Sequence, residues 1–119
     1  MSKSIVLVLL VSVILLTACG GGGAAPAAAP AGNADAGKAV FSGVGGCSAC
    51  HSVEAGKVLV GPSLAGIAED SAAELRASII NPGANVEEGF DAGVMPTDYG
   101  TKLTEQQIND LVAYLSTLK

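Results

Sequence analysis

The chain has 119 residues, of which half are hydrophobic but only 3% are aromatic. A chain of this length forms one small domain at most, and a core with so few large side chains usually needs a metal, a disulfide or a cofactor. The formal net charge of −5 excludes nucleic acid as a partner, because domains that bind it present clustered positive charge.

The N-terminus has the pattern of an export signal. Lys3 precedes an uncharged apolar run over residues 5–16, shorter than the roughly 20 residues that span a bilayer as a helix. This pattern is typical of a secretory signal peptide, rather than of an uncleaved anchor or a buried helix. The following LTAC resembles the lipobox of bacterial lipoproteins, which implies that Cys19 is lipid-modified and becomes the first mature residue.

Residues 20–32 consist only of glycine, alanine and proline. Such a segment buries too little side chain to order itself, so the sequence predicts a tether. The chain therefore divides into a lipoprotein signal peptide (residues 1–18), a lipidated cysteine with its tether (19–33) and a folded domain (34–119). We expect the protein at the bacterial cell membrane, lipid-anchored and facing the periplasm or the exterior.

The first predicted helix covers residues 34–42, with Asn33 or Asp35 as its N-cap. Gly37 and Phe41 are four residues apart and share one face of this helix. A glycine inside a helix costs about 1 kcal/mol relative to alanine, so Gly37 indicates that another helix passes close by.

Two further helices begin with capping boxes. Ser71 and Glu74 form the first box, before a helix that ends at Pro82. Thr104 and Gln107 form the second, before a C-terminal helix with a hydrophobic staple from Leu103 to Ile108 and further apolar residues at helical spacing: Leu111, Val112, Leu115 and Leu118. No stretch alternates over the length of a strand. The sequence predicts an all-α domain with three main helices and long glycine-rich loops.

The reactive side chains are concentrated in the pentapeptide CSACH, where Cys47, Cys50 and His51 form a C-x-x-C-H motif. This spacing is compatible with a thiol redox couple, part of a zinc site or the attachment site of a c-type haem. A redox couple needs a βαβ context, which is missing, and zinc needs a fourth ligand. Haem attachment uses all three residues, since the two thiols form thioethers and the histidine ligates iron.

A haem iron has a second axial position, and the sequence contains no other histidine for it. Once the signal peptide is removed, Met95 is the only methionine. Pro96 disfavours helical backbone at Met95, and Gly93 adds freedom to the approach. We therefore predict that Met95 lies on a loop and ligates the iron through its sulfur.

These motifs together resemble the class I cytochromes c over the whole domain after the tether: DAGKAVFSGVGGCSACH, GPSLAGI, IINPG, GVMP and LTEQQINDLVAYL. The resemblance implies three main helices around one covalent haem. It also implies that the carbonyl of Pro62 accepts a hydrogen bond from His51. The first and last helices are expected to cross at a glycine–aromatic pair, here Gly37 and Phe41 against Leu111, Tyr114 and Leu115. Family members often place a tryptophan near the haem propionates, and Tyr99 is the available substitute.

Two permanent axial ligands leave no open site for a substrate. The sequence thus predicts a membrane-tethered electron carrier of a respiratory or photosynthetic chain, not an enzyme on its own. Its partners would be redox proteins: it is a mobile carrier or a subunit of a quinol-oxidising or oxidase complex, similar to the mono-haem lipoprotein subunits of alternative complex III. The alternatives are a haem-based gas sensor or peroxidase-like enzyme in which Met95 is displaced, and a purely structural subunit.

One loop carries three acidic residues, Glu87, Glu88 and Asp91. They have two interpretations: a solvated face, or a surface that meets a basic docking patch.

Overall fold

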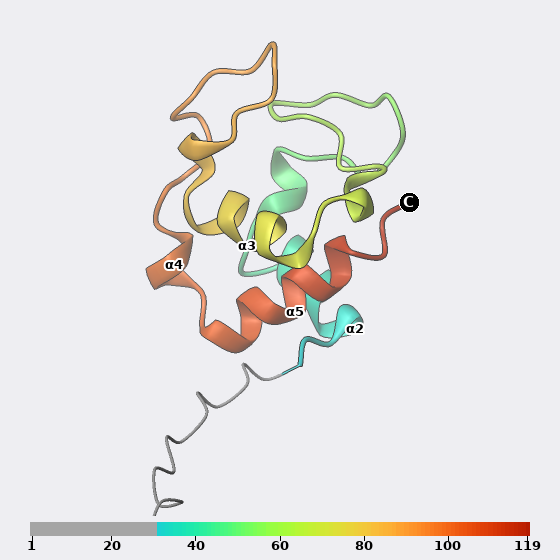
Figure 1. Ribbon diagram of the computed structural model, residues 1–119, viewed down its shortest axis with the longest axis vertical. Helices are drawn as coiled ribbons and strands as arrows, with labels where there is room; N and C mark the ends of the chain where they lie inside the picture. Colours follow the sequence, from blue (N-terminus) through green and yellow to red (C-terminus); the bar gives the residue numbers. More distant parts are fainter. Residues whose placement is uncertain (1–30) are drawn as a thin grey trace, which may run out of the picture.

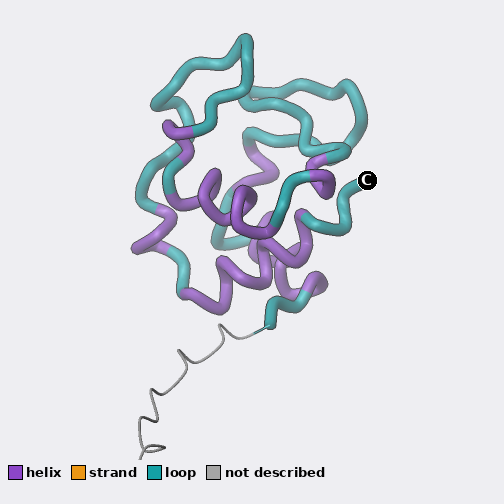
Figure 2. Tube along the Cα trace, viewed as in Figure 1, coloured by secondary structure: helices purple, strands orange, loops and turns teal. Residues whose placement is uncertain are grey.

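The computed structural model describes residues 31–119, so the predicted signal peptide, the lipidated Cys19 and most of the tether lie outside the described residues. Within residues 31–119 no strand is present, which agrees with the predicted all-α class (Figures 1 and 2). The α-helices are α2 (Ala34–Ser42), α3 (Ala72–Ile80), α4 (Tyr99–Lys102) and α5 (Glu105–Leu115), with short 3₁₀ helices at Cys47–Ala49, Ile67–Glu69 and Pro82–Ala84. The three main helices were predicted; α4 and the 3₁₀ helices were not.

The helix starts follow the predicted capping chemistry. The side chain of Asn33 accepts a hydrogen bond of 2.9 Å from the backbone N–H of Ala36, so Asn33 and not Asp35 caps α2. Both capping boxes are complete, at Ser71 for α3 and at Thr104 for α5. These caps satisfy backbone N–H groups that have no partner inside the helix.

Helices α2 and α5 pack directly against each other, and Gly37 makes this approach possible. A Cβ atom at Gly37 would collide with the backbone carbonyl of Asp110 and would lie 2.8 Å from the Cβ of Tyr114. One turn further, the rings of Phe41 and Tyr114 meet at a centroid distance of 5.5 Å and a tilt of 60°. The predicted crossing of the first and last helices is confirmed, and it explains the glycine inside α2.

The beginning of the described chain is fixed to α5. The backbone N–H of Asn33 donates a 2.8 Å hydrogen bond to the carboxylate of Asp110, which is buried. Gln106 Nε2 donates to the same carboxylate and to the carbonyl of Ala31. Gly32 lies so close to the α5 backbone that any side chain there would collide with it. Residues 31–33, which the sequence assigns to the tether, therefore contact the folded domain.

The buried core lies between α2, α3, α4 and α5. Its residues are apolar side chains brought together from all four helices and their flanks: Val40, Phe41, Leu75, Ile79, Tyr99, Leu103, Ile108, Leu111, Val112 and Leu115. Leu103 and Ile108 are both part of it, as the predicted staple requires.

Two long loops form the opposite end of the domain, at the top of Figure 1. We call them loop A (residues 52–63, green) and loop B (residues 85–97, orange). The described chain begins at the other end, below α2 (Figure 1). The loops and the helices together enclose a cavity.

Candidate functional site

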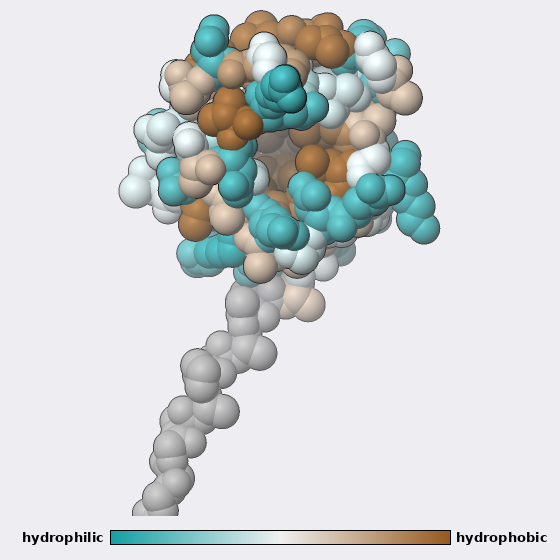
Figure 3. Space-filling model, turned by 45° about the horizontal axis from the view of Figure 1, so that its top comes forward, coloured by the Kyte–Doolittle hydropathy of each residue, from teal (hydrophilic) through white to brown (hydrophobic). Residues whose placement is uncertain are grey.

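A cavity of about 830 Å³ opens between the helices and the two loops. Figure 3 looks into its opening, where hydrophobic residues lie inside the hollow and above it. The volume lies in the range of ligand-binding pockets, about 300–1,000 Å³. Its inner wall is made of core residues: Phe41, Leu75, Ile79, Tyr99, Leu111 and Leu115. The predicted site residues of the domain also line this cavity: Cys47, Cys50, His51, Pro62 and Met95.

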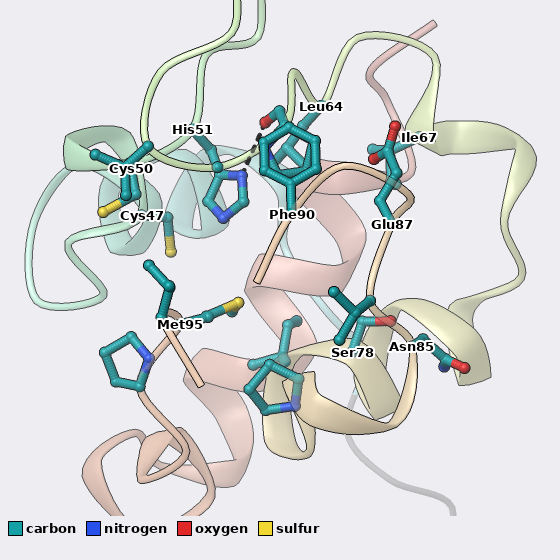
Figure 4. A pocket seen from close by; sticks show the side chains of 18 of the residues that line it. Cys47, Cys50, His51, Leu64, Ile67, Ser78, Asn85, Glu87, Phe90 and Met95 are labelled. Carbon is teal, nitrogen blue, oxygen red and sulfur yellow. Dashed lines mark hydrogen bonds between the residues drawn. The ribbon is translucent and has the colours of Figure 1, made fainter. Parts of the chain in front are cut away.

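The imidazole of His51 has a defined orientation and tautomer. Its Nδ1 lies 2.9 Å from the backbone oxygen of Pro62. Because a carbonyl oxygen can only accept, Nδ1 carries the proton and Nε2 keeps a free lone pair. Figure 4 shows Nε2 directed into the cavity. The hydrogen bond that the resemblance implied is therefore present, and it leaves His51 in the form that binds a metal.

Gly61 lies flat against the same imidazole ring. A Cβ atom there would be 2.6 Å from Cε1 and 2.9 Å from Nδ1 of His51, distances at which the ring has to move. The N–H of Gly61 donates a 2.9 Å hydrogen bond to the carbonyl of Cys50, which ties loop A to the residue before the histidine. This role of Gly61 was not predicted from the sequence, where its position directly before Pro62 was the available signal.

The two cysteines lie on a tight turn at the edge of the cavity. Gly46, at a φ of 64°, begins the 3₁₀ helix, and the N–H groups of Cys50 and His51 both donate to the carbonyl of Cys47. This turn brings both thiols and the imidazole to one edge of the cavity, where the sulfur of Cys47 points inward (Figure 4). In the described part of the chain both cysteines have free thiols.

The environment of Cys47 does not favour thiolate chemistry. Burial raises the pKa of the Cys47 thiol, and the neighbouring Cys50 acts in the same direction, while a backbone hydrogen bond and Lys102 oppose the rise. Redox-active and metal-binding cysteines instead have lowered pKa values. Within residues 31–119 no three His, Cys, Asp or Glu side chains converge as metal ligands would. The geometry thus favours neither a redox dithiol nor a zinc site.

Met95 reaches the cavity from loop B. Gly93 adopts a φ of 88°, a left-handed conformation that suits glycine, and the chain then passes through Met95 without helical structure. Met95 is half-buried and packs against the core. His51 and Met95 face each other across the cavity in Figure 4. The prediction that Met95 lies on a loop is confirmed.

Tyr99 is buried at the start of α4 and lines the cavity. Burial raises the pKa of its hydroxyl, and Cys47, Cys50 and Asp98 act in the same direction, so the phenol stays protonated. Lys102 Nζ lies 5.5 Å from the centre of the Tyr99 ring. Tyr99 therefore lines the same cavity as the two thiols. A contact of Tyr99 with haem propionates stays a prediction.

The residues around the cavity fit a covalently attached haem. The walls are mostly apolar, as a porphyrin requires, and two free cysteine thiols border the space. The imidazole of His51, with Nε2 directed into the cavity, and the thioether sulfur of Met95 enter from facing sides. Iron in a porphyrin accepts this pair of ligands. Within residues 31–119 there is no group of three or more His, Cys, Asp or Glu side chains that could hold a metal ion without a porphyrin. Fold and site define a helical domain that binds haem covalently.

The comparison with protein families supports this conclusion. The family model for cytochrome c matches residues 34–119. The chain belongs to the cytochrome c family, whose members bind haem c covalently, typically one in a single-domain form, and transfer electrons with it. A search among curated protein sequences found no match. No helix among residues 31–119 is long and apolar enough to cross a membrane.

Proposed function

We propose that the chain is a membrane-tethered, mono-haem electron carrier of a respiratory or photosynthetic chain and has no enzymatic activity of its own. One arrangement carries this proposal: His51 and Met95 face each other across an apolar cavity whose edge holds Cys47 and Cys50. A bound haem supplies a one-electron iron couple there. If His51 and Met95 both held the iron of this group, no coordination position would be left for a substrate.

Each residue has a defined task in this proposal. Cys47 and Cys50 would hold the porphyrin through thioether bonds to its two vinyl groups. His51 ligates through Nε2, and the carbonyl of Pro62 keeps its ring oriented and increases its basicity. Met95 supplies a soft ligand that favours ferrous iron, and the apolar walls disfavour the extra charge of the ferric state. Both effects raise the reduction potential.

The proposed place of action is the outer surface of a bacterial cell membrane. Cys19 carries the lipid, and the Gly/Ala/Pro segment after it lets the domain move near the surface. In this setting the protein serves either as a mobile carrier or as a subunit of a quinol-oxidising complex of the alternative complex III type.

Substitution of Met95 tests the proposed ligation. The ferric wild type should show the weak long-wavelength sulfur-to-iron absorption band. Met95→Ala should lose this band, lower the reduction potential and bind carbon monoxide when reduced, because a coordination position opens. Met95→His is the matched control: it should stay six-coordinate at a lower potential, since imidazole stabilises ferric iron better than a thioether does. A wild type without the band that binds carbon monoxide readily would contradict the ligation.

Substitution of Cys19 tests the anchor. Cys19→Ser should move the protein from the membrane fraction to the soluble fraction or block its maturation, because stable membrane binding needs two or more acyl chains. Mass spectrometry of the N-terminal peptide checks the modification directly. An unacylated, soluble wild type would rule out the lipid anchor.

A further inference from the structure

The charged residues around the cavity are mostly of one sign. Three carboxylic acids line it, Asp70, Glu87 and Asp91, and no lysine or arginine does so among the described residues. Reduction of a bound haem adds one electron, so a nearby carboxylate favours the oxidised form and a nearby cation favours the reduced form. A cation close to the cavity wall would therefore raise the reduction potential against these carboxylates.

The cations of residues 31–119 differ in what lies beside them. Lys57 and Arg76 each form a salt bridge with a carboxylate. Lys38 lies on α2, and Lys119 follows α5. Lys102 lies on α4, where its Nζ is 5.5 Å from the centre of an aromatic ring that lines the cavity. Lys102 is therefore the cation that the structure places beside the cavity wall.

Helix α4 holds Lys102 on the ring of Tyr99. The two residues are three positions apart, so their side chains lie on the same side of this single turn. The backbone N–H groups of Thr101 and Lys102 both donate to the carbonyl of Asp98. Tyr99 and Leu103 are buried in the core, which fixes the turn. The distance of 5.5 Å lies within the range of a cation–π interaction, up to about 6 Å.

The charge of Lys102 acts at the edge of the cavity that holds the cysteines. Burial raises the pKa of the Cys47 thiol, and Lys102 acts against this rise. A positive charge that favours a thiolate at this edge also favours the reduced form of a haem attached there, because both carry one more negative charge than their counterparts.

We propose that Lys102, held against the ring of Tyr99, raises the reduction potential of the haem that the cavity would hold, in opposition to the carboxylates of the cavity wall. The proposal rests on the electron-transfer function proposed above. It adds a contribution from outside the cavity to that of the axial ligands. Because Lys102 is exposed, salt screens this contribution, whereas it does not screen a ligand bound to the iron.

A potentiometric titration of the full haem-loaded chain measures the contribution. At low salt and a fixed electrode potential, Lys102→Gln should lower the ratio of reduced to oxidised protein about two- to fivefold, as expected for one exposed charge. The difference should largely disappear at about 1 M salt, where the Debye length is about 3 Å. Lys102→Arg keeps the charge and should keep the wild-type potential. Lys119→Gln removes the same charge across the domain from α4 and should have a smaller effect (Figure 1).

Two further variants separate the charge from the packing of α4. Asp98 makes no side-chain cap of this helix, so Asp98→Asn removes a negative charge from the same turn without loss of a capping bond. It should raise the potential, the opposite sign to Lys102→Gln. Tyr99→Leu removes the ring, and in this background Lys102→Gln should shift the potential less than in the wild type. In Tyr99→Phe, which keeps the ring, the full shift should remain.

Several results would overturn the role of Lys102. These are an unchanged potential of Lys102→Gln at low salt, a shift that about 1 M salt leaves intact, equal shifts in Lys102→Gln and Lys119→Gln, or a shift that is the same with and without the ring of Tyr99. The proposed function fails on a different observation, a wild type that holds no covalent haem or does not take up one electron reversibly. A protein that passes this test but shows no effect of Lys102 retains the function and loses the inference.

Discussion

His51 is constrained from two directions by neighbouring residues on loop A. The carbonyl of Pro62 accepts the Nδ1 proton, and Gly61 covers the face of the ring. Together they fix both the tautomer and the plane of the imidazole. Motif spacing identifies His51 and the family resemblance identifies Pro62, but the contact of Gly61 depends on how loop A returns to the motif, which spacing does not describe.

We predict that Gly61→Ala disturbs the histidine. The added methyl group would lie 2.6 Å from Cε1, so the ring has to shift and the bond to Pro62 weakens. We expect a loss of about 1–3 kcal/mol in the free energy of unfolding of the haem-loaded protein, the usual cost of overpacking, and a shifted reduction potential. Denaturant unfolding and a redox titration measure the two effects. Gly83→Ala is the control, because no atom lies within 4 Å of a Cβ atom there. Equal behaviour of the two variants would refute the positioning role.

At the scale of elements, helices α3 and α5 both begin with a capping box. The residue at the third helical position is a carboxylic acid in α3 and an amide in α5. Glu74 closes the box of α3, whereas Gln107 closes that of α5. Hydrogen bonds from the side chain and the backbone N–H of Ser71 lower the pKa of Glu74 from its ordinary value of 4.5. A carboxylate with a lowered pKa stabilises the folded state above its ordinary pKa, and this contribution disappears as the pH falls through the folded-state pKa.

We predict that the two caps respond differently to acid. The free energy of unfolding of the wild type should fall relative to that of Glu74→Gln as the pH drops below about 4.5, because only the wild type has a carboxylate to protonate. The reciprocal variant Gln107→Glu should add a second acid-sensitive cap. Denaturant unfolding between neutral pH and pH 3 measures both. Parallel stability curves for the wild type and Glu74→Gln would contradict the cap mechanism.

The helices whose starts and apolar faces are determined by local sequence were predicted with their caps. Caps, staples and the glycine inside α2 are determined within one or two turns, and the predicted helices agree with the structure. Helix α4 was missed because its single turn, Tyr99–Lys102, has neither an apolar period nor a side-chain cap. The facing positions of His51 and Met95 depend on two segments separated by α3. The C-x-x-C-H motif and the lack of any other axial ligand predicted this pair, but local patterning could not describe how the two segments face each other.

At the scale of the whole molecule, the hydrophobic core and the wall of the cavity share most of their residues. Six of the ten buried apolar residues also line the cavity. The cavity opens to solvent and its wall is mostly apolar, so water in it would leave this part of the core surface hydrated. A group that covers this wall adds the burial of that apolar surface to the stability of the folded domain.

We predict that the domain does not fold cooperatively without haem. Cys47→Ser with Cys50→Ser, prepared free of haem, should lose much of its helical circular dichroism and its sharp thermal transition. The haem-loaded wild type should keep both. A haem-free variant that unfolds at the wild-type temperature would contradict the prediction, because the protein alone would then maintain the cavity.

The bonds that join Asn33 and Ala31 to Asp110 and Gln106 have a mechanical consequence. A force applied to the chain before residue 31 would act first on the contact between residues 31–33 and α5, next to the interface of α2 and α5. These hydrogen bonds lie at the end of the domain away from loops A and B (Figure 1). With the proposed membrane tether attached at this point, a pull on it would load the contact between residues 31–33 and α5 before the segments that hold His51 and Met95.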